Sequence, residues 1–229
     1  MINVYFYQVN KGDLTEHAEK YLALLPPWRT ERYHRMKIES GKLEELAAGL
    51  LLRYALRDAA GIDLLNAEMT KNPHGKPELA EGQIHFNLSH SDGYIAAAVA
   101  DCPVGIDVET NVDRDGKIAK RFFSEEEQQA IRDAEDPQLA FRRIWTRKEA
   151  YVKCTGTGIE GAIDRIPGLA DRFGAYSITT LREGAAYTLS LAIQSPVDDS
   201  QIVVHDVDPA DESLSFLPPA HGLSQSLFH

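Results

Sequence analysis

The sequence predicts an α+β fold in two halves, each with a small, mostly antiparallel β-sheet and helices packed on it. Three observations support this prediction: short runs of β-branched and aromatic residues, intervening segments with apolar residues at helical spacing, and an order of element types that starts again after about residue 110. The halves are expected to span 1–105 and 106–212, followed by a tail at 213–229 with little periodicity. No residue-level repeat is visible, so this organisation rests on element order alone.

In the first half, residues 2–9 (INVYFYQV) have the composition of a strand. Residues 12–25 are predicted to be helical, and the proline pair that follows is expected to end that helix. Residues 40–61 carry leucines at helical spacing and finish on a glycine suited to a helix C-cap. A turn-rich connection, 70–79, leads to residues 84–110, whose three short apolar runs predict adjacent strands.

The second half begins with residues 117–131, in which Ser124 and the acidic residues after it predict the start of a helix. A further helix is expected from about 138 to 153. Residues 175–194 predict a β-hairpin that turns at a Glu–Gly pair, and residues 201–208 predict one more strand.

Composition and charge limit the class of partner. The formal net charge is −11, which argues against a nucleic acid held by a general electrostatic field. The cations are nevertheless concentrated in the segment WRTERYHRMK, so a small anionic ligand is compatible with the sequence. No apolar run approaches the roughly 18 residues of a membrane span, and no signal peptide is visible. The two cysteines share no metal-like spacing, and we expect a reduced cytoplasmic protein.

The segment GIDVE places two carboxylates on one face of a predicted strand. Because side chains alternate along a strand, Asp107 and Glu109 point the same way. Carboxylates that close raise each other's pKa unless a cation lies between them. Oxygen ligands of this kind suit a hard ion such as magnesium. The alternative interpretation is a solvent-exposed strand face, because a lone DxE pattern is common.

The segment FNLSHS gathers polar side chains where a buried strand gives way to a turn. His90 could donate a hydrogen bond to a phosphate oxygen. Ser89 and His90 could also form half of a hydrolase dyad, although the chain contains no GxSxG elbow. A third interpretation is a polar turn that satisfies its own backbone groups.

The segment WTRKEAYVKCTGTG has a comparable ambiguity. Glu149 and Lys153 are four residues apart and share a helix face, which is typical of an i,i+4 salt bridge. Lys148 adds a further cation, and the glycines leave backbone available at the helix end, which would suit a phosphate. No P-loop pattern is present. Lys76, in the turn HGKP, could contact an anion or simply lie on the surface.

Taken in order, the segments GKP, FNLSHS, VGIDVE, FFSEEE and WTRKEAYVKCTGTGI resemble the 4′-phosphopantetheinyl transferases. The similarity is to the larger class typified by the surfactin-synthetase activator and covers residues from about 25 to 160. It implies transfer of phosphopantetheine from coenzyme A to a serine of an apo acyl or peptidyl carrier protein, with release of adenosine 3′,5′-bisphosphate. It also implies a magnesium ion, with manganese as an alternative, a monomer, no nucleic-acid or membrane partner, and a site in a cleft between pseudo-symmetric halves.

The resemblance also implies roles for individual residues. The metal ligands would be Asp107, Glu109 and Glu149; the catalytic residues would be Glu149, as the base for the carrier serine, and Lys153. The residues that bind coenzyme A would be Arg29, Arg32, Lys76, Ser89, His90, Lys148 and Lys153. Glu44 and Glu45 depart from the family pattern, because an acidic residue beside the 3′-phosphate would be unfavourable without a compensating cation.

Other functions remain compatible with these residues. One is a non-catalytic module that binds coenzyme A or a carrier protein on the same fold. Another is a metal-dependent phosphodiesterase that hydrolyses coenzyme A without a carrier. No motif indicates whether the carrier serves fatty-acid, polyketide or peptide synthesis.

Overall fold

A computed structural model of the chain describes residues 1–9, 11–110, 116–158, 163–195 and 201–207, and the tail expected at 213–229 lies outside them. The described residues form an α+β fold with two four-stranded sheets, a separate two-stranded hairpin and helices on the outer faces. The predicted fold class, small sheets of mostly antiparallel strands with helices packed on them, is therefore confirmed.

The first half begins with a strand, continues through four helices and ends in strands. Its elements are β1 (Ile2–Gln8), α1 (Lys11–Glu16), α2 (Ala18–Leu22), α3 (Pro27–Arg35), α4 (Glu39–Ala60), β2 (Met69–Lys71), β3 (Pro77–Leu79), β4 (His85–Ser91) and β5 (Tyr94–Ala100). Gly61 caps α4 in the left-handed conformation, as its sequence predicted.

Two expectations for the first half need correction. The helix predicted at 12–25 is divided at His17 into α1 and α2, and α2 ends at Leu22, before the proline pair, which instead starts α3. Pro27 is tolerated there because the first residue of a helix has no intrahelical N–H partner to lose. The turn-rich connection at 70–79 is also more ordered than predicted, because β2 and β3 pair within it as an antiparallel hairpin.

The described part of the second half contains a four-stranded antiparallel sheet and three helices. Its elements are β6 (Val104–Glu109), α5 (Lys117–Phe122), α6 (Glu125–Asp133), α7 (Pro137–Thr155), a 3₁₀ turn (Ile163–Arg165), β7 (Arg172–Phe173), β8 (Tyr176–Glu183) and β9 (Thr188–Ile193). Ser124 caps α6 as predicted, and Glu127 completes a reciprocal capping box with it.

The last described strand, β10 (Ile202–Asp206), returns to the first half. It pairs in parallel with β1, so that the first sheet has the order β10-β1-β5-β4, whereas the second sheet has the order β6-β9-β8-β7. The division into 1–105 and 106–212 stays a prediction. Strand β6 spans the boundary between residues 105 and 106, and β10, from the second range, joins the sheet of the first.

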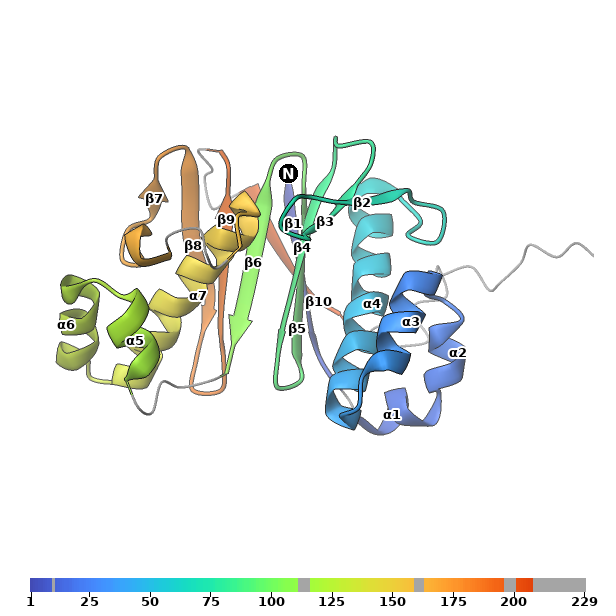
Figure 1. The fold of residues 1–229 in the computed structure, drawn as a ribbon, viewed down its shortest axis with the longest axis horizontal. Coiled ribbons are helices and arrows are strands. Elements are labelled where there is room, and N and C mark those ends of the chain that lie inside the picture. Colours follow the sequence, from blue (N-terminus) through green and yellow to red (C-terminus); the bar gives the residue numbers. More distant parts are fainter. Residues whose placement is uncertain (10, 111–115, 159–162, 196–200, 208–229) are drawn as a thin grey trace, which may run out of the picture.

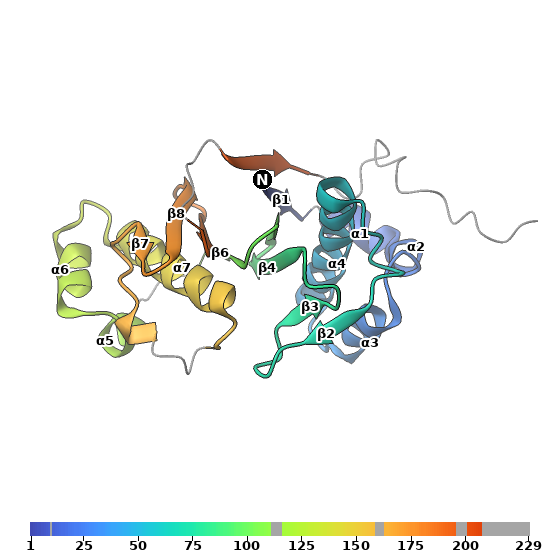
Figure 2. The ribbon, with the colours of Figure 1, turned by 90° about the horizontal axis from the view of Figure 1, so that it is seen from above.

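The two sheets lie next to each other between two groups of helices, with α1–α4 at one end of the molecule and α5–α7 at the other (Figures 1 and 2). Alternation along β1 explains this layering, because its successive side chains point to opposite faces. Tyr5 and Tyr7 pack toward α4, whereas Val4 and Phe6 pack against Ile106 and the other apolar residues of β6 and β9. The halves therefore share a buried core.

Helix α7 covers the opposite face of the second sheet. Its small residues Ala150 and Cys154 are buried against Ile178 and Ala192. Gly105 of β6 faces this helix so closely that a Cβ atom there would collide with the backbone of α7. The glycine of the GIDVE segment therefore sets the distance between α7 and β6, and with it the separation of the candidate site residues.

Candidate active site

A row of hydrogen bonds joins the edges of the two sheets, and we call this row the seam. Alternate side chains of β4 accept hydrogen bonds from the backbone N–H groups along β6. The pairs are Asn87 with Ile106 (2.9 Å), Ser89 with Val108 (3.2 Å) and Ser91 with Thr110 (3.2 Å). Side chains thus satisfy the edge of β6 in place of another strand, since unpaired backbone donors are costly to bury.

Asp107 lies at the centre of the seam and is only 5% exposed. Its Oδ1 atom accepts hydrogen bonds from Lys153 Nζ at 2.6 Å and from Ser89 Oγ at 2.9 Å, and Lys153 also donates to Ser89 Oγ at 2.9 Å. Glu109 lies two residues after Asp107 on β6, and its Oε1 atom accepts a hydrogen bond from Ser91 Oγ at 2.6 Å. The two carboxylates of GIDVE therefore follow the alternate serines of β4, as expected for a shared strand face.

Glu149 of α7 completes a group of interacting charges. Burial, reinforced by the negative charges of Asp107 and Glu109 and opposed by Lys153, raises the pKa of Glu149 to about 7. Burial also raises the pKa of Asp107, against the opposing charge and hydrogen bond of Lys153. The structure thus brings together four residues that the sequence singled out as catalytic or metal-binding.

Two oxygens in this group are buried and have no hydrogen-bond partner: Oδ2 of Asp107 and Oε1 of Glu149. A buried carboxylate oxygen without a donor carries a desolvation cost that a ligand could relieve. Within the described ranges, however, no three His, Cys, Asp or Glu side chains are arranged as a ready-made metal centre. The ammonium group of Lys153 already pairs with the Asp107 carboxylate.

The structure directs Lys148 away from this group, and its contact with coenzyme A stays a prediction. The side chain is fully buried, and its Nζ lies 2.9 Å from Glu127 Oε2 and donates to the carbonyl oxygens of Phe122 and Ile163. Burial lowers the pKa of Lys148, while the charge and hydrogen bond of Glu127 oppose that shift. These contacts fix α7 against α6 and do not leave the ammonium group free to bind coenzyme A.

Lys76 and Ser89 are also engaged with protein groups. Lys76 Nζ donates to three backbone carbonyls, those of Val104, Lys153 and Cys154, at 3.2, 2.7 and 3.4 Å. Ser89 is buried within the seam. Neither contact supports the prediction that these two side chains bind a ligand directly.

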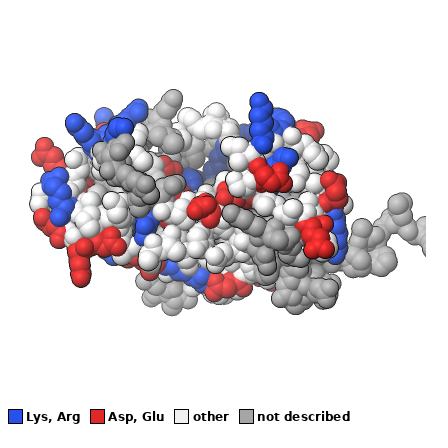
Figure 3. Space-filling view, turned by 90° about the horizontal axis from the view of Figure 1, so that it is seen from below, with Lys and Arg blue, Asp and Glu red and all other residues white. Residues whose placement is uncertain are grey.

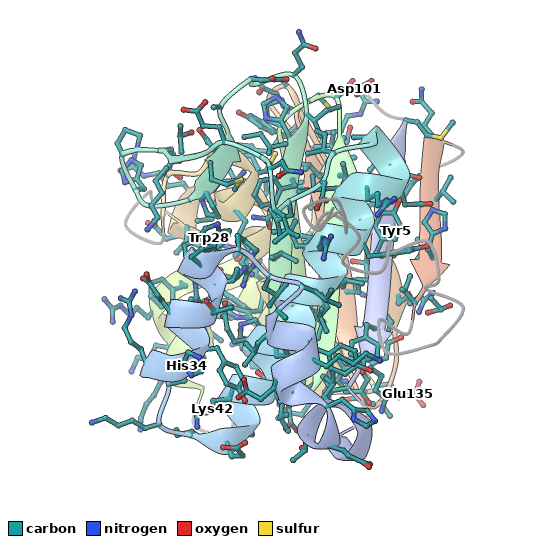
Figure 4. All side chains as sticks on the ribbon, turned by 90° about the vertical axis from the view of Figure 1, so that its right-hand side faces the viewer. Tyr5, Trp28, His34, Lys42, Asp101 and Glu135 are labelled. Carbon is teal, nitrogen blue, oxygen red and sulfur yellow. The ribbon has the colours of Figure 1, made fainter. Side chains whose placement is uncertain are left out.

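A second polar site lies in the first half, where α3, α4 and β4 meet around a cavity of about 160 Å³. Arg29, Arg32 and His90 line it, and their binding of coenzyme A stays a prediction. Figure 4 shows α3 alongside α4, with Trp28 near the start of α3 and His34 nearer its end. The guanidinium of Arg29 also lies over the Trp28 ring, 4.9 Å from its centroid.

Glu45 pairs with both arginines of this cavity, and Glu44 contacts His90. Glu45 is buried and pairs with Arg29 at 2.5 Å and with Arg32 at 2.9 Å. Glu44 lies 3.0 Å from His90 Nδ1 and accepts a hydrogen bond from the backbone of Gly93. The acidic departure seen in the sequence is therefore built into the site, where Glu45 holds the two arginines in place.

The described residues also include a surface of mixed charge and two cysteines. Acidic and basic side chains are interspersed over the face shown in Figure 3. Cys102 and Cys154 are both free thiols, and burial raises the pKa of Cys154 to about 12. No helix in the described part of the chain is long and apolar enough to cross a membrane.

Sequence reasoning missed three residues that organise these sites. The spacing of Ser124 and Glu127 is a capping-box signal, but nothing local indicates that Glu127 also holds Lys148. Asn72 donates to the carbonyl of Gly156, 84 residues away, and no periodicity predicts such a contact. Glu45 was noted only as an obstacle to anion binding.

Comparisons with known proteins bear on the family to which this chain belongs. The model of the 4′-phosphopantetheinyl transferase superfamily matches residues 103–205, which include β6 and α7. A 4′-phosphopantetheinyl transferase, gsp, of Aneurinibacillus migulanus is 40% identical over 162 residues, or 69% of this chain and 68% of that protein. The 4′-phosphopantetheinyl transferase Sfp of Bacillus subtilis is 23% identical over 211 residues, or 91% of this chain and 88% of that protein.

Among solved structures, a holo-(acyl-carrier-protein) synthase from Bacillus anthracis overlaps 43% of this chain and 91% of that chain, at 21% identity and a TM-score of 0.35. That overlap is too partial to add to the argument. The gsp relative is 40% identical, and its match covers more than two thirds of both chains. This chain belongs to the 4′-phosphopantetheinyl transferase family.

Proposed function

We propose that the protein transfers 4′-phosphopantetheine from coenzyme A to a serine of an apo acyl or peptidyl carrier protein. The observation that carries this proposal is the group formed by Asp107, Glu109, Glu149 and Lys153 at the seam between the two sheets. In the reaction, the serine oxygen forms a bond to the β-phosphorus of coenzyme A. The bond from that phosphorus to adenosine 3′,5′-bisphosphate breaks, and the bisphosphate leaves.

We propose that Glu149 accepts the serine proton. A general base works best when its pKa lies near the operating pH, and burial raises the pKa of Glu149 to about 7. The buried, unpartnered Oε1 atom is available to accept the proton directly or through one water molecule. Lys153 would stabilise the negative charge that develops on the phosphate, because electrostatic stabilisation dominates phosphoryl transfer.

The carboxylates also fit a divalent cation. Asp107, Glu109 and Glu149 offer only oxygen donors, which magnesium and manganese prefer, and two of those oxygens are buried without a partner. When bound, such an ion would supply Lewis-acid stabilisation of the phosphate oxygens. We therefore propose that these three residues hold the ion, with Lys153 already balancing part of their negative charge.

The cavity between α3, α4 and β4 is the proposed site for the nucleotide end of coenzyme A. Arg29, Arg32 and His90 could each donate to a phosphate oxygen, and Arg32 is 61% exposed and thus accessible. Glu45 holds both guanidinium groups in place but reduces the net positive charge. We expect the cavity to contribute more to orientation than to affinity.

We also propose a cellular compartment and an oligomeric state for the protein. Two free cysteines, one of them buried, suit a reducing compartment such as the cytoplasm. We propose a monomer that meets its carrier protein transiently, as the resemblance implied.

An apo-carrier panel tests the function directly. Purified protein, coenzyme A and magnesium are incubated with several apo carrier proteins, and each carrier is measured by intact mass. We expect a gain of about 340 Da, the mass of the phosphopantetheinyl group. Absence of any mass shift would contradict the proposal. Calorimetric binding of coenzyme A without transfer would then favour a non-catalytic module, whereas release of bisphosphate without a carrier would favour a phosphodiesterase.

A further inference from the structure

The β2–β3 hairpin lies against the C-terminal end of α7. Lys76, from this hairpin, places its Nζ among the carbonyl oxygens of Lys153 and Cys154 in the last turn of the helix and that of Val104 at the start of β6. The last carbonyls of a helix lack intrahelical partners and carry partial negative charge. A lysine ammonium with three donors therefore satisfies the helix end and ties it to β6.

Asn72 makes a second contact from the same hairpin. Its side-chain oxygen accepts hydrogen bonds from the backbone N–H groups of His74 and Lys76, both at 2.9 Å, which close the turn. Its Nδ2 donates to the carbonyl of Gly156 at 3.0 Å, and Gly156 is the left-handed C-cap of α7, with φ +67°. One side chain thus shapes the hairpin turn and holds the helix cap.

Helix α7 connects these contacts to the group formed by Asp107, Glu109, Glu149 and Lys153. Lys153 contributes its backbone carbonyl to Lys76 and its Nζ to Asp107, so the residue that Lys76 holds is the one that meets the carboxylate. Glu149 lies one turn earlier on the same helix. A shift of the last turn of α7 would therefore move both side chains relative to β6.

We infer that Lys76 and Asn72 are positioning residues, which fix the C-terminal turn of α7 so that Lys153 and Glu149 meet Asp107 in the reactive arrangement. This inference rests on the proposed transfer reaction and assigns Lys76 a role other than binding coenzyme A. The two roles differ in what a substitution changes. Loss of a ligand contact weakens coenzyme A binding, whereas misplacement of about 1 Å can cost on the order of 100-fold in rate without a matching loss of affinity.

The experiment compares Lys76→Met with Lys71→Met, an exposed lysine on the same hairpin. For each variant we would measure kcat for carrier modification, the Kd for coenzyme A by calorimetry, and amide hydrogen exchange in residues 153–156. For Lys76→Met we expect kcat to fall about 10- to 100-fold, a Kd within about threefold of wild type, and faster exchange at the helix end. Lys71→Met should match wild type in all three, and Lys76→Arg should restore much of kcat because its guanidinium can still donate to carbonyls.

Two results would overturn the inference. One is a Kd for coenzyme A that rises at least tenfold while kcat and exchange stay normal, which would make Lys76 a ligand contact. The other is a Lys76→Met protein that is unchanged in every measurement.

Asn72→Asp provides a second route if Lys76→Met does not fold. It keeps the oxygen that closes the turn but replaces the donor to Gly156 with a carboxylate oxygen, and we expect lower kcat and faster exchange at residues 153–156. Normal kcat with normal exchange in this variant would contradict the inference. Hydrogen exchange also separates the two hypotheses: if wild-type protein modifies no carrier, the proposed function fails, while the exchange data still report whether the hairpin holds the helix.

Discussion

Replacing Lys148 with methionine separates two roles that a lysine in the WTRKEA segment could have. The sequence predicts a residue that binds coenzyme A, whereas the structure shows a fully buried ion pair with Glu127. Methionine has a length similar to that of lysine but is apolar. Lys148→Met therefore fills the same space and removes only the charge and its hydrogen bonds. The principal consequence should therefore be a loss of folding stability.

The contacts of Lys148 set the size of that loss. Removing one partner of a buried ion pair costs about 3–5 kcal/mol, because the other charge is left buried and uncompensated. Glu127 is 4% exposed, but it keeps hydrogen bonds from the backbone N–H groups of Ser124 and Gly168. These two donors still stabilise the carboxylate, so we expect a value near the lower end, about 3 kcal/mol.

Urea unfolding of wild type, Lys148→Met, Glu127→Gln and the double variant measures this quantity as a thermodynamic cycle. We expect the double variant to be more stable than the sum of the single losses predicts, by about 1–3 kcal/mol of coupling. Calorimetry on the folded Lys148→Met protein should give a Kd for coenzyme A close to that of wild type. The reasoning fails if stability changes by less than about 0.5 kcal/mol while coenzyme A binding weakens tenfold.

Three further predictions follow from single contacts. Gly105→Ala should cost about 1–3 kcal/mol and reduce kcat, because its Cβ atom would force α7 away from β6; urea unfolding and steady-state rates measure both, and an unaffected protein would contradict the close approach. Glu45→Gln should lower the Kd for coenzyme A severalfold, more at low salt than at high salt, since it frees the charge of the two arginines in α3; calorimetry at two salt concentrations tests this, and weaker binding would show that Glu45 acts mainly by holding those arginines. The hydrogen bond and charge of Arg182 lower the pKa of Asp206 in the folded state. Their pairing therefore stabilises the fold above the unfolded pKa of about 3.9, and this stabilisation is lost as pH falls through the lower folded pKa. Asp206→Asn should flatten the pH dependence of stability below about pH 4, and an unchanged slope in urea unfolding would argue against the pair.

The sequence was most informative where structure is determined locally. The glycine cap of α4, the serine cap of α6 and the β8–β9 hairpin all follow from residue types within a few positions of one another. Alternation along β6 likewise placed Asp107 and Glu109 on one face. By contrast, β10 pairs with β1 across about 200 residues, and a strand-like composition cannot specify which partner it will take.

Within the candidate sites, too, the sequence predicted local relationships but not contacts between distant elements. Helical spacing predicted that Glu149 and Lys153 share a face, and the simplest consequence was a salt bridge between them. In the structure Lys153 bonds to Asp107 of the facing strand, a contact that depends on how α7 packs on β6. Lys148 and Lys76 matched the family motif in identity, but burial and hydrogen bonds, which only the folded chain defines, set where their ammonium groups point.

The most direct test of the account is the rate of mass gain on an apo carrier protein that accepts the wild-type enzyme, measured beside Glu149→Gln. The glutamine has the same shape and should leave folding intact, but it cannot accept the serine proton. We predict a gain of about 340 Da with wild type and a rate at least about 100-fold lower with the variant. A near-normal rate for a folded Glu149→Gln protein would contradict the assignment of the catalytic group.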